Sequence, residues 1–424
     1  MIIDTREYGG VCLCGREHIM TTRSVVIESG CLLRLEEILE QSGIRGKRCA
    51  IYGENSYAAT ADRHPRAGQE IVLPAAGLHA DERSTARVLE LLDGDVEVIL
   101  AVGSGTIHDI ARYCARERGL RLVSCPTAAS VDGFCSTVSA MTWHGYKKTV
   151  PAVAPEIVVA DTEIIRNAPP ELVKSGVGDI LAKYTALADW KIANVLTGEY
   201  FCPRIYDMMR KAVDTAVGSI DGLLRGETEA YTSVTYALVL SGIAMQMMGN
   251  SRPASGAEHH ISHLIEMGPT ALTVAFPALH GEKTGVGSVL AAREYKRLAD
   301  IDILASCLSE YEPLSPEEIN AFFGNNLAKA ILMENRSDCL ATVQNETLIC
   351  KWPQIKRIIA DIPDPEYLYG LLEMLDAKRE PEDIGVTEDD VETIFEYSPL
   401  VRNRLTLMRI RRLMKQTGNR ERSA

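Results

Sequence analysis

The stretch Val98-Ile-Leu-Ala-Val-Gly-Ser-Gly-Thr-Ile-His-Asp109 decides the fold. An apolar, β-branched run enters a Gly-Ser-Gly turn, and a helical spacing of apolar residues follows to about residue 117. A strand that feeds a glycine turn at a helix N-terminus exposes backbone N–H groups to an anion, which the helix dipole also favours. The stretch therefore predicts a site for the pyrophosphate of a dinucleotide. The spacing is not the full GxGxxG pattern, so a purely geometric use of glycine stays open.

Similar short apolar runs surround this stretch, each bounded by Gly, Pro or polar residues, as buried parallel strands are. They lie at residues 24–28, 49–52, 70–73, 96–102, 122–125 and 157–160. After residue 166 helical spacing dominates, at 178–197, 204–224, 230–248 and 285–299. The pattern predicts an α/β, Rossmann-like N-terminal domain over residues 1–166 and an all-α C-terminal domain over 167–424.

Composition excludes several classes of protein. The 424 residues carry 45 Lys and Arg against 58 Asp and Glu, a net charge of −13, which argues against nucleic acid as a partner. No run approaches the ~18 apolar residues of a membrane span, and the first residues lack the apolar core of a signal peptide. The eleven cysteines are scattered and odd in number, which favours a reduced, cytoplasmic protein. Small anionic ligands remain possible, because local donors can reverse the field inside one cleft.

Polar residues also follow the next strand. Cys125-Pro-Thr-Ala-Ala-Ser-Val-Asp-Gly133 places the hydroxyls of Thr127 and Ser130 and the carboxylate of Asp132 at a strand C-terminus. Ligands bind at this edge of open α/β sheets. Capping and turn formation is the alternative explanation.

A second group of residues indicates a metal. Asp179 and Lys183 are four apart on one helix face, His259 and His263 share another face, and His280 follows. Two imidazoles and a carboxylate suit a divalent metal with open coordination positions; zinc is the default, and nickel or iron is compatible. Solvent-exposed helical histidines are the alternative.

The N-terminal Cys12-Leu-Cys14-Gly-Arg-Glu-His18 gathers two thiols and an imidazole. A structural zinc site needs a fourth ligand, and no candidate is adjacent in the sequence. The alternative is a β-turn that contains small buried thiols.

Six motifs together resemble the sn-glycerol-1-phosphate dehydrogenases, in their bacterial branch. The motifs are Gly103-Ser-Gly105 with His108-Asp109, Pro126-Thr-Ala-Ala-Ser130 with Asp132-Gly133, Gly178-Asp-Ile-Leu-Ala-Lys183, Asp189-Trp190, Arg252-Pro-Ala-Ser-Gly-Ala-Glu-His259 with Ser262-His263, and His280-Gly-Glu-Lys283. That family belongs with the iron-containing alcohol dehydrogenases, glycerol dehydrogenases and dehydroquinate synthases, so the resemblance implies a dehydroquinate synthase-like fold. It is collinear from about residue 20 to about residue 300.

The resemblance also implies a role for each matching residue. Asp179, His259 and His280 would bind the metal, and Asp132, Asp179 and His263 would face the substrate. From position alone, and not from the resemblance, Lys183 is the first candidate to bind the substrate phosphate, ahead of Lys148 and Arg252. The cofactor would contact Gly103, Ser104, Gly105, Thr106, Ile107, His108, Asp109, Thr127, Ala128, Ala129, Ser130 and Ser136. Glu54, beside Gly53 at the end of the second strand, would repel a 2′-phosphate, but NAD and NADP both stay open.

The implied reaction is the NAD(P)H- and metal-dependent reduction of dihydroxyacetone phosphate, a phosphorylated triose, to sn-glycerol 1-phosphate. Three alternatives stay open: a dehydrogenase of unphosphorylated polyols, a dehydroquinate synthase-like cyclase, and a nucleotide- or metal-binding sensor without turnover. Asp179 counts against the cyclase, since that branch uses Glu as its first metal ligand. The resemblance further implies a homo-oligomer, a dimer or larger.

Overall fold

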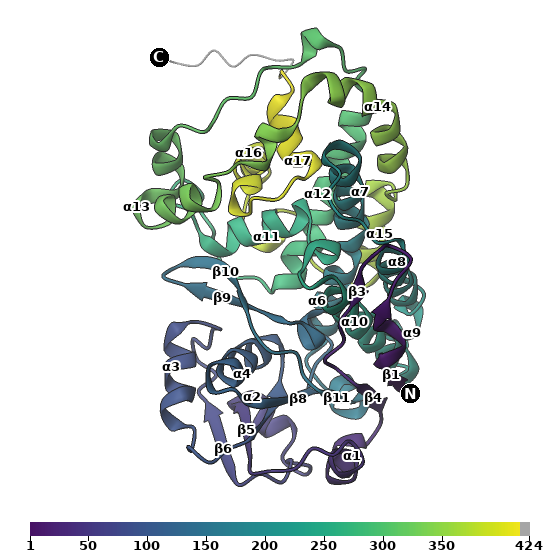
Figure 1. Cartoon of the computed structure of the whole chain (residues 1–424), viewed down its shortest axis with the longest axis vertical. Helices are drawn as coiled ribbons and strands as arrows, with labels where there is room; N and C mark the ends of the chain where they lie inside the picture. The colour runs from purple at the N-terminus through teal and green to yellow at the C-terminus, as the bar shows by residue number, and fades with distance from the viewer. Residues whose placement is uncertain (416–424) are drawn as a thin grey trace.

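The computed structural model describes residues 1–415, and a seven-stranded sheet forms its N-terminal part (Figure 1). All neighbouring strands are parallel except β1, which runs antiparallel to β4. In spatial order the strands are β1 (Ile2–Asp4), β4 (Ser24–Glu28), β11 (Ile157–Asp161), β8 (Arg121–Pro126), β7 (Val98–Gly103), β5 (Arg48–Gly53) and β6 (Gln69–Leu73). The six strands predicted from apolar runs are all confirmed.

Helices cover both faces of this sheet, which explains why its central strands are apolar throughout. Alternate residues of β7 point to opposite faces. Leu100 packs with Leu35 and Leu39 of α1 (Leu35–Gln41) on one face. Ala101 packs on the other face, in one cluster with residues of α3 (Glu82–Leu91) and α4 (Gly105–Arg118). The short helix α2 (Glu54–Ala59) follows β5.

Two hairpins were not predicted, because their strands are short or carry polar, half-exposed residues. One pairs β9 (Val138–Trp143) with β10 (Tyr146–Pro151), and the other pairs β2 (Gly10–Val11) with β3 (Glu17–His18). The β9–β10 hairpin lies between the sheet and the helices above it in Figure 1. Tyr146 Oη donates to the Val401 carbonyl at 3.1 Å and so attaches this hairpin to the C-terminal region.

The remainder is helical, and the predicted combination of an α/β part with an all-α part is confirmed. The helices are α5 (Thr162–Arg166), α6 (Pro170–Leu181), α7 (Lys183–Thr197), α8 (Pro203–Val217), α9 (Ile220–Leu224), α10 (Thr228–Met248), α11 (Ala257–Met267), α12 (His280–Ala299), α13 (Pro316–Glu334), α14 (Asn345–Ala360), α15 (Pro365–Met374), α16 (Val391–Tyr397) and α17 (Leu407–Ile410). The domain boundary at residues 166 and 167 stays a prediction; it falls between α5 and α6.

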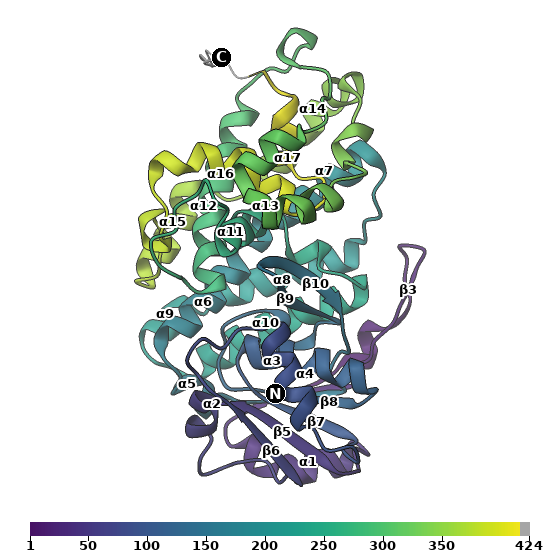
Figure 2. The same ribbon diagram turned by 90° about the vertical axis from the view of Figure 1, so that its left-hand side faces the viewer.

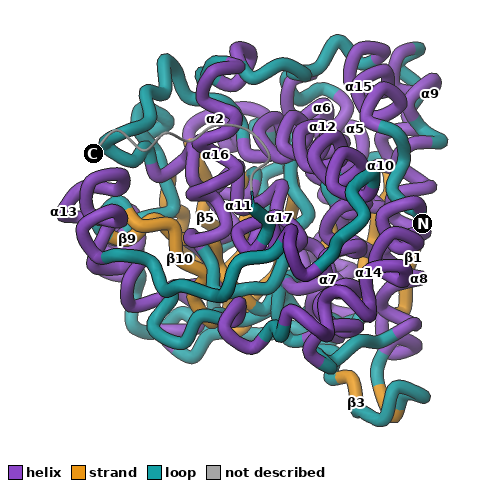
Figure 3. Tube along the Cα trace, turned by 90° about the horizontal axis from the view of Figure 1, so that it is seen from above, coloured by secondary structure: helices purple, strands orange, loops and turns teal. Residues whose placement is uncertain are grey.

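Two predicted helices are each divided in the structure. The helix expected over 178–197 changes direction at Ala182, between α6 and α7, and that expected over 204–224 is interrupted at Gly218 and Ser219. Helix α10 is buried on all sides over residues 237–247, where its sequence is almost wholly apolar. Figure 3 shows the helices of this part from above, in purple. Within residues 1–415 no helix combines the length and apolarity that a membrane crossing requires.

Candidate active site

Helices α6 and α12 cross with their backbones in contact, and glycines make this possible. A Cβ atom at Gly178 would lie 2.3 Å from the Gly281 carbonyl oxygen, and one at Gly281 would lie 1.8 Å from the Ser175 carbonyl oxygen. Neither position accepts a larger residue without moving a helix. Asp179 and His280 are the chain neighbours of these glycines, so the crossing brings the two side chains together.

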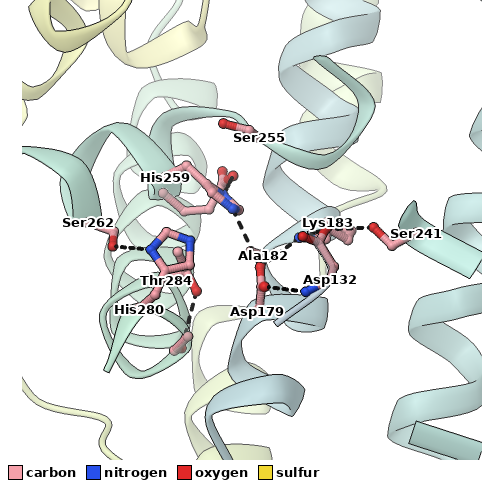
Figure 4. Close-up of polar contacts among 12 residues, drawn as sticks. Asp132, Asp179, Ala182, Lys183, Ser241, Ser255, His259, Ser262, His280 and Thr284 are labelled. Atoms are coloured by element: carbon pink, nitrogen blue, oxygen red, sulfur yellow. Dashed lines mark hydrogen bonds and ion pairs between the residues drawn. The ribbon is translucent and has the colours of Figure 1, made fainter. Parts of the chain in front are cut away.

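His259 on α11 completes a group of three possible metal ligands with Asp179 and His280 (Figure 4). One donor atom from each residue lies within 4.8 Å of the others, and His259 Nε2 is 3.5 Å from Asp179 Oδ1. The Nδ1 atoms are held elsewhere: His259 donates to Glu258 Oε1 and His280 donates to Glu266 Oε1, both at 2.8 Å. Such outer carboxylates fix the tautomer that presents Nε2 to a metal. The residues therefore fit a divalent metal.

A second donor group, formed by His263, Glu266 and His280, shares one histidine with the first. Glu266 already accepts the His280 Nδ1 proton and pairs with Lys147 at 3.0 Å. Burial would raise the pKa of Glu266, but the nearby Lys147, followed by the contact with His280, holds it well below its usual range. These contacts make Glu266 an orienting group for His280, so the group that contains Asp179 suits a metal better.

Lys183 lies behind Asp179, one helical turn further along the chain. Its Nζ is 2.8 Å from Asp179 Oδ1 and 2.9 Å from Asp132 Oδ2, and its side chain is completely buried. Burial alone would lower the pKa of Lys183, but the two carboxylates raise it above its ordinary value. Asp132 is further held by Ser241, which donates to Oδ2 at 2.7 Å, and its own N–H donates to Asp179 Oδ2 at 3.0 Å. Lys183 thus holds two aspartates in place and is not among the residues that line the cleft, so its contact with a substrate phosphate stays a prediction.

A cleft of about 230 Å³ joins the metal-ligand group to the glycine turn of the sheet. Nine of the residues expected to form the site line it: Gly105, Thr106, Asp109, Asp132, Ser136, Asp179, His259, His263 and His280. The N-terminus of α4 begins at Gly105, where an added Cβ would lie 2.8 Å from Val131 Cγ2. The cleft therefore places a helix N-terminus, which favours anions, opposite the metal-ligand group.

The other residues predicted to contact the cofactor do not line the cleft themselves. Ile107 packs against Gly103, the last residue of β7. His108 Nδ1 donates a hydrogen bond to the Ser104 carbonyl at 2.9 Å. The remaining members of this group are Thr127, Ala128, Ala129 and Ser130 of the buried strand end and the exposed Glu54, which accepts the Ala75 N–H at 2.8 Å. Their contacts with a cofactor stay predictions.

His263 combines burial with an unpartnered nitrogen. Its ring lines the cleft and stacks on His280 with 5.6 Å between ring centroids, while Nδ1 has no hydrogen-bond partner among the described residues. Burial, followed by the nearby Arg402, lowers the pKa of His263 well below its ordinary value. The imidazole is therefore neutral at physiological pH and can donate from one ring nitrogen.

Sequence reasoning missed two cations of the cleft, Lys147 and Arg112. Lys147 reaches the cleft from β10, an unpredicted strand, and its side chain is 20% exposed. Arg112 connects the turn after β8 to β9, because it donates to the carbonyls of Gly133 and Val138. Sequence reasoning also missed the roles of Glu258 and Glu266. The position of Glu258 directly beside His259 could have indicated a carboxylate that orients this histidine.

Comparisons with known proteins agree with this geometry. Residues 26–169 match the model of the iron-containing alcohol dehydrogenase family. The glycerol-1-phosphate dehydrogenase [NAD(P)+] of Geobacillus stearothermophilus is 34% identical over 330 residues, which cover 78% of this chain and 75% of that protein. The protein of the same name from Bacillus subtilis is 32% identical over 377 residues, or 89% and 80% of the two chains.

Solved structures show the same fold at lower identity. A probable glycerol dehydrogenase from Sinorhizobium meliloti superposes with a TM-score of 0.59 at 16% identity over 89% of both chains. An NADH-dependent butanol dehydrogenase from Thermotoga maritima gives 0.59 at 14% identity over 92% of both. The motif resemblance is thereby confirmed: the chain belongs to the glycerol-1-phosphate dehydrogenase family, among the iron-containing alcohol dehydrogenases.

Proposed function

We propose that the protein reduces dihydroxyacetone phosphate to sn-glycerol 1-phosphate with NADH or NADPH and one divalent metal, Zn²⁺ or Ni²⁺. One observation carries this proposal: two histidines held by glutamates face Asp179 in a cleft whose other wall is the N-terminus of α4. The relatives' printed names, glycerol-1-phosphate dehydrogenase [NAD(P)+], supply the substrate and cofactor class.

The chain's own residues bind the metal, orient its ligands and serve the proton transfer. When bound, the metal supplies Lewis-acid polarisation of the ketone and the nicotinamide supplies hydride. Asp179, His259 and His280 hold the metal, while Lys183 and Asp132 hold Asp179 in place. The substrate oxygen must also receive a proton, and His263 lines the cleft where this transfer takes place. Because its imidazole is neutral, it would pass a proton from one ring nitrogen to the substrate only as the other nitrogen takes one from water, so that the ring stays neutral throughout.

Lys147 is the proposed donor for the substrate phosphate. It is the lysine that lines the cleft, whereas Lys183 is buried and Lys148 is exposed on the neighbouring position of β10. Arg252 is engaged elsewhere, because its guanidinium pairs with Glu199 at 2.7 Å. Lys147 is held by Glu266, so it is oriented before a phosphate arrives.

The proposal also covers the preference between NAD(H) and NADP(H) and the oligomeric state. Glu54 follows β5, directly beside the glycine turn of β7, and its carboxylate there favours NAD(H) over NADP(H). We further propose that the enzyme acts in the cytoplasm as a dimer or larger homo-oligomer, in line with its eleven free thiols and its family membership.

One assay tests the proposed function. Purified protein, stripped with a chelator and reloaded with Zn²⁺, Ni²⁺ or no metal, is given NADH or NADPH with dihydroxyacetone phosphate or dihydroxyacetone. We expect metal-dependent oxidation of the nicotinamide, with kcat/KM much higher for the phosphorylated ketone, and a product that chiral analysis identifies as the 1-phosphate. Equal kcat/KM for both ketones would indicate a polyol dehydrogenase. If no metal supports turnover, the remaining alternatives are a dehydroquinate synthase-like cyclase and a nucleotide- or metal-binding protein without activity.

A further inference from the structure

We propose that Cys12, Cys14, His18 and Cys202 form a second, structural zinc site, separate from the cleft. The first three residues lie on the β2–β3 hairpin, and Cys202 immediately precedes α8, far away in the sequence. One donor atom from each of the four lies within 4.8 Å of the others. Cys202 is the fourth ligand that the N-terminal motif lacked. This proposal does not depend on the proposed function.

The distances agree with a tetrahedral zinc centre. The Sγ atoms of Cys12 and Cys202 are 3.9 Å apart, and His18 Nε2 lies 3.6 Å from the Sγ of Cys14 and 3.6 Å from that of Cys202. Zn–S bonds of about 2.3 Å and Zn–N bonds of about 2.0–2.1 Å at tetrahedral angles separate ligand atoms by about 3.5–3.8 Å. A zinc ion at the centre of the four atoms therefore needs only small side-chain movements.

The surroundings prepare these groups for a cation. His18 Nδ1 donates to the Met247 carbonyl at 2.8 Å, which leaves the lone pair of the neutral ring on Nε2, facing the sulfurs. Cys202 is the N-cap of α8, so the positive end of the helix dipole lies beside its sulfur. Tyr200 Oη lies 3.1 Å from Cys14 Sγ. Cys202 and His18 are buried, and Cys12 and Cys14 are half-buried, so four protein atoms close the site.

The hairpin has few stabilising contacts of its own, although Arg16 lies over the Tyr200 ring at 3.5 Å and His18 donates to the Met247 carbonyl. Each of its strands has two residues, and an isolated hairpin of this size is unstable in water. Val11 is 89% exposed, Leu13 is fully exposed and Ile19 is 76% exposed, so its apolar side chains form no core. Figure 2 shows the hairpin as an arm at the side of the molecule. A zinc ion would attach this arm to the start of α8 through Cys202.

The site and the catalytic centre differ in chemistry, which allows a selective test. The cleft offers oxygen and nitrogen ligands, whereas the hairpin site offers three thiolates. In the variant His259→Ala/His280→Ala, we expect about one equivalent of zinc to remain after purification. X-ray absorption at the zinc edge should then give three sulfur atoms at about 2.3 Å and one nitrogen at about 2.0–2.1 Å. Replacement by Co²⁺ should produce thiolate-to-metal charge-transfer absorption, which the cleft ligands cannot produce.

Cysteine variants complete the experiment. Adding Cys14→Ser and Cys202→Ser to the histidine variant should abolish the remaining zinc and the cobalt absorption, whereas adding Cys350→Ser, at an exposed position, should change neither. Chelation should also expose the hairpin to trypsin at Arg16. The proposal is overturned if the histidine variant purifies without zinc, if its zinc lacks sulfur neighbours, or if mass spectrometry finds a Cys12–Cys202 disulfide. These measurements use the histidine variant alone, so they hold even if the cysteine variants do not fold.

Discussion

Lys183 Nζ and Asp179 Oδ1 lie 2.8 Å apart, and both side chains are buried directly behind the proposed metal position. A buried charge that loses its partner is far more costly than an intact pair. The two residues therefore act as one structural unit, and substitution of either affects stability as well as the site.

The first prediction concerns this pair. Lys183→Met should lower the free energy of unfolding by about 3–5 kcal/mol, because Asp132 and Asp179 would be left as unpaired buried carboxylates. It should also weaken metal binding, since Asp179 loses its orientation. Denaturant unfolding and metal titration measure both effects. Lys174→Met, which removes a surface pair with Asp376, should cost less than about 1 kcal/mol. An equal loss of unfolding free energy in the two variants would contradict the view that Lys183 holds two buried carboxylates.

The second prediction concerns the phosphate. Lys147→Met should raise KM for dihydroxyacetone phosphate by about 10–100-fold, the effect of losing a charged hydrogen bond of about 1.5–3 kcal/mol. KM for dihydroxyacetone should change little. Lys148→Met, at the exposed neighbouring position, is the matched control and should leave both values near wild type. Steady-state kinetics with both ketones measure these KM values. An equal rise in KM for both ketones would exclude Lys147 as the group that binds the phosphate.

The third prediction concerns the carboxylates that hold the ligand histidines. Glu258→Gln and Glu266→Gln should each weaken metal binding by about 10–100-fold, because the Nδ1 acceptor that fixes each imidazole is weakened. Competition titration with a chromophoric chelator measures the affinity. Glu282→Gln, which alters a contact with the Leu279 N–H at the start of α12, should not change it. If Glu266→Gln abolished binding while Asp179→Asn did not, Glu266 itself would be the ligand.

The fourth prediction concerns acid stability. Burial lowers the pKa of His108 from its ordinary 6.5 to about 3, against the opposing effect of the hydrogen bond to the Ser104 carbonyl. The unfolded chain binds a proton below pH 6.5 while the folded chain does not, so this contribution to stability is lost as pH falls from 6.5 towards 3. The slope is about 1.4 kcal/mol per pH unit.

His108→Gln should remove this slope from the pH dependence of unfolding, although it also lowers stability at neutral pH. His144→Asn is the control, because that side chain is 83% exposed. Denaturant unfolding at several pH values compares the variants. An unchanged slope in His108→Gln would show that the buried imidazole is not the group responsible.

The sequence by itself determined the strands and the ligand types. Apolar runs located six strands of the sheet, because a strand buried on both faces must be apolar along its whole length. Spacing singled out Asp179, His259, His263 and His280 as candidate ligands, since metal chemistry restricts ligands to a few residue types. The family resemblance then selected Asp179, His259 and His280 among them. The scattered cysteines, by contrast, gave no fourth partner for Cys12, Cys14 and His18, because the spacing of residues along a chain does not report contacts between distant segments.

Only the tertiary structure decided which groups meet. The glycine contact of α6 with α12 places Asp179 beside His280, and the buried Lys183 lies between Asp179 and Asp132. The β9–β10 hairpin brings Lys147 to the cleft, and the approach of α8 to the N-terminal hairpin brings Cys202 to His18. Periodicity predicts which face of an element is buried, but long-range packing alone sets which buried or polar groups lie within a few ångströms of one another.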